Sequence, residues 1–138
     1  MADITAAKKS TDRQDGEIIS FQQGAEKIWE GALVAINAAG YAVNAGDDAS
    51  TVVVGVADET VDNSAGNAGD KEIKVRRTGV FTFEFGGTAT IADVNTLVYA
   101  SDNQTVNLAG ALTNDIIVGR IVEFIDASTV RVDIRDRA

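Results

Sequence analysis

One pattern of apolar runs, polar turns and a glycine occurs twice in this sequence, and this repeat constrains the fold more than any other feature. Each copy contains a hairpin-like segment and then a strand of the form apolar-apolar-Val-Gly-x-apolar, with Gly55 in the first copy and Gly119 in the second. The offset is 64 at these glycines (119 − 55) and slips to 63 inside the turn, where Val43 aligns with Val106. Two related β units bury their apolar faces against each other, which predicts a small β-barrel or sandwich. The copies span about 31–59 (segments 33–36, 42–44 and 52–59) and about 95–123 (segments 97–100, 105–107 and 116–123).

Period-two alternation extends the β assignment to the end of the chain. Val130, Val132 and Ile134 alternate with polar neighbours, as in a strand with one buried face and one solvent-exposed face. Helical periodicity is weak, and we expect at most one short helical turn, around 22–29 or near 91–95. The sequence therefore predicts a mostly β fold.

The organisation along the chain is that of one domain with an arm. Residues 1–17 are polar, charge-mixed and aperiodic, which predicts a flexible N-terminal arm that either stays disordered or orders on a partner. From residue 18 onward, short apolar runs alternate with Gly, Asn, Asp and Ser clusters, so we assign 18–138 to a single β domain. Trp29 lies between the arm and the first repeat copy; we expect it at the edge of the core, with a ligand-binding role as the alternative.

The stretch 71–85 predicts a second long strand. Its apolar residues share one parity, and Gly79 lies where a bulge or a sharp bend is expected. The phenylalanines within it are typical of a core or of a subunit interface. A platform for stacking a ligand is the alternative. That platform would use the row Phe81, Phe83 and Phe85 together with Tyr41 or Tyr99.

Composition excludes several kinds of chemistry. The chain has no Cys and no His, which removes thiol nucleophiles, zinc-thiolate sites and the commonest general base. A formal charge of −9 argues against nucleic-acid binding, because such proteins need a basic surface. No apolar stretch approaches the roughly 20 residues of a membrane span, and no export signal is recognisable. We therefore expect no enzyme, no cofactor, no nucleic-acid partner and no membrane contact.

The acidic residues form turn-like clusters. Asp47 and Asp48 lie in one such cluster, and Asp58, Glu59, Asp62 and Asp70 lie in another. Carboxylates among Gly, Asn and Ser usually form turns and solvated surface. The segment 62–70 also has oxygen ligands for Ca²⁺, although its spacing differs from that of an EF-hand loop. A mobile acidic loop is the preferred interpretation, and the Ca²⁺ question stays open.

The order of these segments resembles that of a known family. A polar arm is followed by Gly-Ala-Leu-Val-Ala-Ile at 31–36, then by Val-Val-Val-Gly-Val-Ala at 52–57, and then by Arg-Thr-Gly-Val-Phe at 77–81. Read together, these segments are similar to the head decoration, or cement, proteins of tailed bacteriophages, including the lambda type. The resemblance covers roughly 31–85 and consists of hydrophobic and glycine placement.

The resemblance implies a non-enzymatic structural protein. It would bind the outside of an assembled, expanded capsid as a homotrimer at local three-fold axes and stabilise it against internal pressure. It would be made in the host bacterial cytoplasm, with the major capsid protein as its partner. The family's N-terminal segment often supplies contacts, which makes Lys8, Lys9 and Arg13 candidate partner-binding residues. Unlike the lambda type, this segment lacks Pro and has few apolar anchors.

Two other functions fit the same pattern. One is a different structural part of a virion, such as a tail or fibre-associated domain. The other is a small-molecule or sugar-binding β domain that uses the aromatic row and the tyrosines named above. The position of the protein in a purified particle separates the first from a decoration protein, and a ligand screen separates the second.

Overall fold

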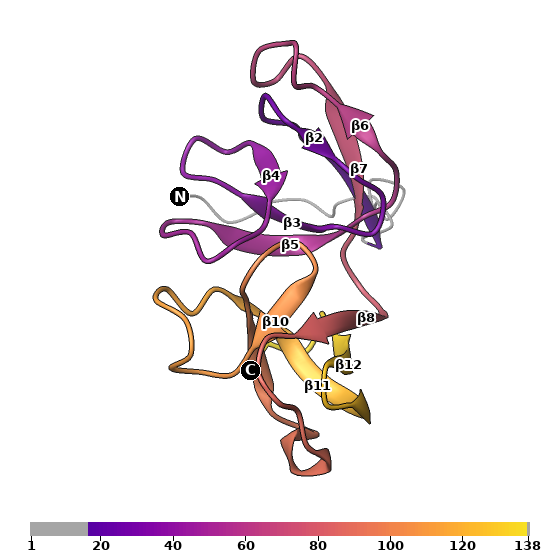
Figure 1. Cartoon of the computed structure of the whole chain (residues 1–138). Helices are drawn as coiled ribbons and strands as arrows, with labels where there is room; N and C mark the ends of the chain where they lie inside the picture. Colours follow the sequence, from indigo (N-terminus) through magenta and orange to yellow (C-terminus); the bar gives the residue numbers. More distant parts are fainter. Residues whose placement is uncertain (1–16, 138) are drawn as a thin grey trace, which may run out of the picture.

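The computed structural model describes residues 17–137, which form a mostly β molecule of two stacked parts (Figure 1). The predicted fold class is confirmed, and within residues 17–137 the one helical turn is η2, at the second of the two expected places. Nowhere in 17–137 does a helix reach the length and apolar character that crossing a membrane demands. The elements are β1 (Ile18–Gln22), β2 (Lys27–Ile28), β3 (Leu33–Ile36), β4 (Ala42–Asn44), β5 (Val52–Ala57), β6 (Val61–Asp62), β7 (Glu72–Arg76), β8 (Val80–Phe85), η2 (Ile91–Asp93), β9 (Leu97–Ala100), β10 (Thr105–Asn107), β11 (Ile117–Asp126) and β12 (Thr129–Asp133).

The second half of the chain, 80–133, forms a closed five-stranded barrel, which we call the second unit. Its strand order is β10-β8-β12-β11-β9, and the barrel closes between β9 and β10. Neighbouring strands are antiparallel except β8 and β10, which run parallel with Val106 opposite Phe85. β-Branched side chains fill the interior, as period-two alternation requires. The buried interior residues include Phe83, Phe85, Val98, Ala100, Val106, Val118, Ile121, Val130, Val132 and Ile134.

The first half, 18–76, forms a sheet with the corresponding strand order, β1-β7-β5-β3-β4, and we call it the first unit. Its two ends meet at a single parallel bridge between Gln23 and Ala42, which corresponds to the Phe85–Val106 pair of the second unit. The small two-stranded sheet β2–β6 flanks it. The two halves of the chain are therefore two versions of one five-stranded unit, larger than the repeat segments seen in the sequence.

The registers of β3, β4 and β5 coincide with those of β9, β10 and β11 when residue numbers differ by 64. Val34 lies opposite Gly55, and Val98 lies opposite Gly119. Directly after each of these pairs comes a register shift, so Val54 and Val118 occupy matching bulges.

The proposed slip to 63 in the turn is wrong. Ile36 faces Ala42 and Ala100 faces Val106, so Ala42 rather than Val43 corresponds to Val106. Both Ala42 and Val106 are fully buried, while Val43 is not. The side chain that points inward sets the alignment, and residue similarity alone misses it.

The stretch 71–85 is two strands in two different sheets. β7 belongs to the first unit and β8 to the second, and the chain bends between them at 77–79. Gly79 has φ of +129°, a backbone conformation that side chains disfavour. The expected bend is therefore present, but it separates the two units and is not a kink within one strand.

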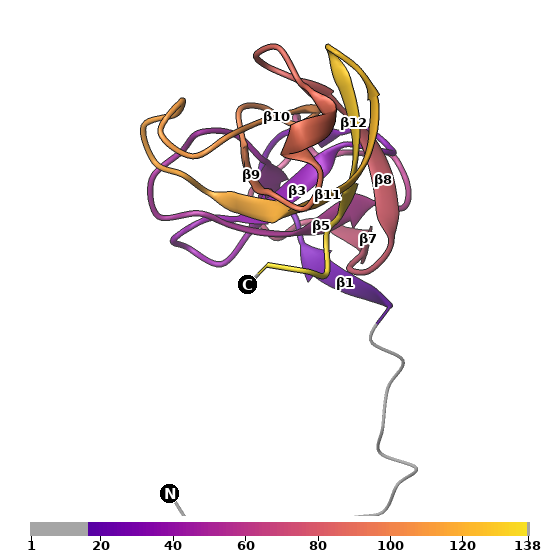
Figure 2. The same cartoon turned by 90° about the horizontal axis from the view of Figure 1, so that it is seen from below.

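The two units share one core. The side chains of Leu33, Ala35, Val53 and Val56 point out of the first unit and pack into the same buried cluster as the barrel interior of the second unit. The opposite face of the same strands, with Val34 among others, lines a separate cluster inside the first unit. Figure 2 shows β5 crossing close to β11, and Arg137 near the C-terminus donates a hydrogen bond to the backbone oxygen of Val53 in β5.

Asp47 joins the loops that lead into β5 and β11. Its two carboxylate oxygens accept hydrogen bonds from the backbone N–H groups of Thr113 and Asn114, both at 2.8 Å. These bonds, the one from Thr113 first, lower the pKa of Asp47. The carboxylate therefore ties the first unit to the second.

Acidification should weaken this tie. Because the pKa of Asp47 is lower in the folded state, its charge stabilises the fold fully at pH values above the unfolded-state pKa near 3.8. This stabilisation is lost as the pH falls through the folded-state pKa. We expect Asp47→Asn to have a lower Tm at pH 6, and the gap from the parent to narrow at pH 3. A residual pH slope is expected, since the pKa values of Asp62 and Asp126 are also lowered. Equal gaps at both pH values would contradict a role for the charge.

Candidate functional site

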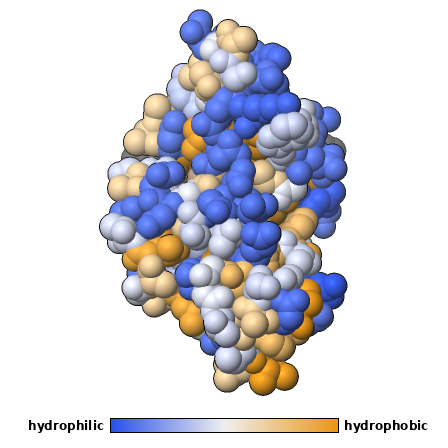
Figure 3. All heavy atoms as spheres, viewed as in Figure 1, coloured by the Kyte–Doolittle hydropathy of each residue, from blue (hydrophilic) through white to orange (hydrophobic). Residues whose placement is uncertain are grey.

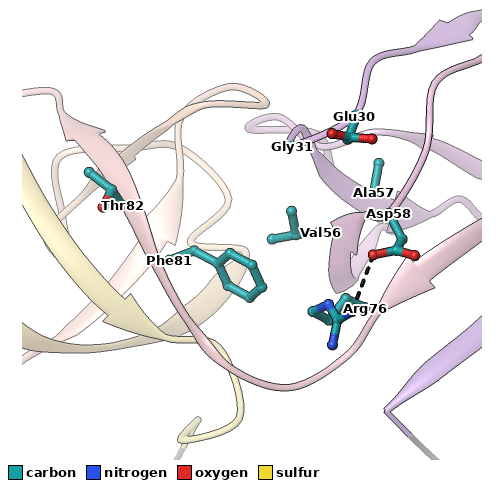
Figure 4. A pocket seen from close by; sticks show the side chains of 8 residues that line it. All are labelled: Glu30, Gly31, Val56, Ala57, Asp58, Arg76, Phe81 and Thr82. Atoms are coloured by element: carbon teal, nitrogen blue, oxygen red, sulfur yellow. Dashed lines mark hydrogen bonds and ion pairs between the residues drawn. The ribbon is translucent and has the colours of Figure 1, made fainter.

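A pocket of about 410 Å³ lies at the junction of the two units (Figure 4). Val56 and Phe81 face it from opposite units, and Arg76 and Asp58 form an ion pair of 3.4 Å at its side. Thr82 supplies the only side-chain hydroxyl among the lining residues. The pocket can accommodate a small polar ligand, but its lining offers no nucleophile held by a base. The lining residues are Glu30, Gly31, Val56, Ala57, Asp58, Arg76, Phe81 and Thr82.

Trp29 lies beside a neighbouring hollow of about 340 Å³ that also includes Asn103 and Gln104. Its side chain is 58% exposed, and the Lys27 ammonium lies 3.7 Å from the ring centroid. The expectation that Trp29 lies at the edge of the core is therefore wrong, because the turn after β2 carries it away from the apolar clusters.

The phenylalanine row is divided between core and surface. Phe83 and Phe85 are 4% and 6% exposed inside the second unit, so they belong to its core. Phe81 lines the junction pocket. Tyr41 and Tyr99 are half-buried and lie on different units. The structure does not bring these five aromatic side chains together as a stacking platform.

The acidic segment 62–70 forms hydrogen bonds within itself and to the residues that follow β1. Asp62 accepts hydrogen bonds from the hydroxyl and backbone N–H of Ser64, which lower its pKa in that order. The buried Asn63 amide donates to the backbone oxygens of Gln23, Gly24 and Asn67. These bonds are those of a turn, and residues 17–137 contain no group of three or more Asp, Glu, His or Cys side chains placed to hold a metal.

Apolar side chains are exposed near one end of the second unit. Ile91 in the loop after β8 is 76% exposed, and Val122 and Ile125 on β11 are also exposed. The backbone bonds Asn95 N–H to Ile121 O and Ala89 N–H to Ala127 O hold this loop against β11. In Figure 3 apolar side chains gather towards this end, whereas the first unit is largely hydrophilic on the face shown. Exposed apolar groups of this kind suit contact with another protein.

Three arginines line a further pocket, of about 360 Å³, which we call the arginine pocket: Arg77, Arg135 and Arg137, with Thr78 and Ile134. The Nε of Arg77 donates to the backbone oxygen of Val54 at 3.4 Å, and Arg137 donates to those of Val53 and Ile134. Burial lowers the pKa of Arg137, and the neighbouring Arg77 lowers it further. None of the three pairs with an acidic side chain of 17–137.

Sequence reasoning selected other basic residues. Lys8, Lys9 and Arg13 lie outside the residues that the structure describes. Nothing marks Arg77 and Arg135 in the sequence except that each lies shortly after an alternating strand, Arg77 after β7 and Arg135 after β12. Arg137 joins them only because the C-terminal segment returns to β5. Comparison with models of protein families, with curated proteins and with solved structures finds no match to this chain.

Proposed function

We propose that this chain is a non-enzymatic structural protein that binds the outside of an assembled phage capsid and stabilises it. The exposed apolar end of the second unit, with Ile91 as its most exposed member, is the observation that carries the proposal. Two units that share one buried core support it, because a protein that bridges subunits must keep its contact surfaces at fixed distances. The sequence resemblance to head decoration proteins supplies the specific role and the homotrimer at local three-fold axes.

A binding experiment tests this function. Purified protein should co-sediment with bare, expanded capsids of its phage and appear by electron microscopy as added density on their outer surface. Decorated capsids should also withstand a higher temperature than bare ones, because a protein that binds only the assembled capsid stabilises it against disassembly. Density at the tail or fibres would assign the chain to another part of the virion, and no density on the particle would overturn the proposal.

A ligand-binding domain is the second candidate, and the exposed Trp29 beside two hollows at the unit junction favours it. One ring face of Trp29 is occupied by Lys27, which leaves the other for stacking on a sugar. A sugar or small molecule that raises the Tm of the free protein, together with absence from capsids, would establish this function instead.

A further inference from the structure

We propose that the arginine pocket binds carboxylate groups of an acidic segment on the protein to which this chain attaches. Arg77, Arg135 and Arg137 would supply the contacts, and a planar carboxylate would accept paired N–H donors from a guanidinium. The identity of the partner as a capsid protein rests on the proposed function, whereas the preference of the pocket for carboxylate groups follows from its three arginines alone.

The three guanidinium groups of the pocket have N–H donors that no group of residues 17–137 accepts, and two of the three groups are anchored. Each guanidinium carries five N–H groups. Arg77 uses one in its bond to the Val54 oxygen, and Arg137 uses bonds to the Val53 and Ile134 oxygens. The side chain of Arg135 makes no hydrogen bond within 17–137 and is exposed. The strand β5 therefore anchors two of the three guanidinium groups, and most of their N–H donors have no hydrogen-bond partner within 17–137.

Within residues 17–137 the positive charges at the pocket are not balanced by acidic side chains. The chain has 21 acidic and 12 basic residues, yet no acidic side chain of the described part pairs with these three arginines. Arg77 and Arg137 are close enough to repel each other. An anion between them would relieve this repulsion and gain charge-assisted hydrogen bonds.

The rest of the molecule favours a protein carboxylate over a nucleic acid. A net charge of −9 repels an extended polyanion, whereas a short acidic segment can reach a local cationic pocket.

Titration of the full-length protein with a hexaglutamate peptide tests the pocket. We expect measurable binding by calorimetry at low salt, and binding about tenfold weaker for Arg135→Gln, the loss typical of one charge-assisted pair. Arg131→Gln is the matched control, because Arg131 is also exposed and changes the net charge equally but pairs with Glu123 at 3.0 Å on another part of the surface. We expect the control to bind as the parent does. Equal weakening in both variants, or no binding by the parent, would overturn the proposal.

Other occupants give different results. Tighter binding of a single-stranded DNA oligonucleotide than of the peptide, lost in Arg135→Gln, would overturn the carboxylate assignment in favour of nucleic acid. A dimer that dissociates in Arg135→Gln, with no peptide binding, would assign the pocket to a second copy. The failure of the proposed function can be distinguished from the failure of the pocket proposal. If the parent binds hexaglutamate but not capsids, the proposed function is wrong and the carboxylate-binding pocket is retained. If capsid binding is equal in the parent and in Arg135→Gln, the pocket fails and the function stands.

Discussion

Replacing Gly55 or Gly119 by alanine should destabilise the protein by about 3 kcal/mol, the upper part of the usual range for overpacking. A Cβ at Gly55 would overlap the backbone carbonyl oxygen of Arg76, and one at Gly119 would overlap that of Asp133. Both oxygens belong to strands held in a hydrogen-bonded ladder, so neither can move aside as a flexible side chain would. The two costs should be equal, because the units place the same close approach at matching positions.

Thermal and urea denaturation of both variants provide the measurement, with an expected fall in Tm of roughly 10 °C for each. Gly87→Ala is the matched control. A Cβ there would meet the ring of Phe85 at 3.4 Å and the side-chain oxygen of Asn107 at 3.7 Å, both ordinary contact distances, so its cost should be small. Two unaffected variants, or one severely destabilised and one unaffected, would mean that the two glycines do not play the same role.

Leu33→Ala should cost about 3 kcal/mol, because Leu33 is 0% exposed and lies in the core that the two units share. Its backbone N–H also donates to the Asn103 oxygen of the second unit at 2.8 Å, which holds the strand in place while the side chain is removed. Leu97 occupies the matching position in the second unit but is only half-buried. Leu97→Ala should therefore cost about 1 kcal/mol, in proportion to the smaller apolar area that it buries.

Calorimetry of the two leucine variants also tests whether the units unfold together. A shared core predicts one cooperative transition for the parent and for both variants, with the larger shift in Leu33→Ala. Two separate transitions in the parent would show that each unit is stable by itself. Equal shifts in the two leucine variants would contradict the burial of Leu33 against the second unit.

Much of the fold could be predicted from local patterns. Alternation such as that of Val130 and Val132 identifies strands, since adjacent side chains in a strand point to opposite faces. The paired glycines at 55 and 119 identified the repeat, because each marks a close approach of two backbones. Gly79 indicated a bend. These features depend on a few neighbouring residues, so the sequence contains them.

Long-range features could not be predicted in the same way. Ile73 and Phe83 both have odd residue numbers, which would place them on one face of a continuous strand. In the structure they lie in different units, because period-two alternation does not show which sheet a strand joins. The alignment of Val43 with Val106 failed for a related reason, since only pairing with β3 and β9 shows which side chain points inward. Likewise, nothing local shows that the turn after β2 leaves Trp29 exposed.

Strand alternation, turn residues and two glycines identify this chain as a β protein built from a repeated unit, because all three act over short distances in the chain. The folded structure was needed to show that the repeat comprises two complete five-stranded units with a common core. It alone also placed Arg77, Arg135 and Arg137 around one pocket. The physical reason is that these arrangements depend on which surfaces pack together, and packing joins residues that are far apart in the chain.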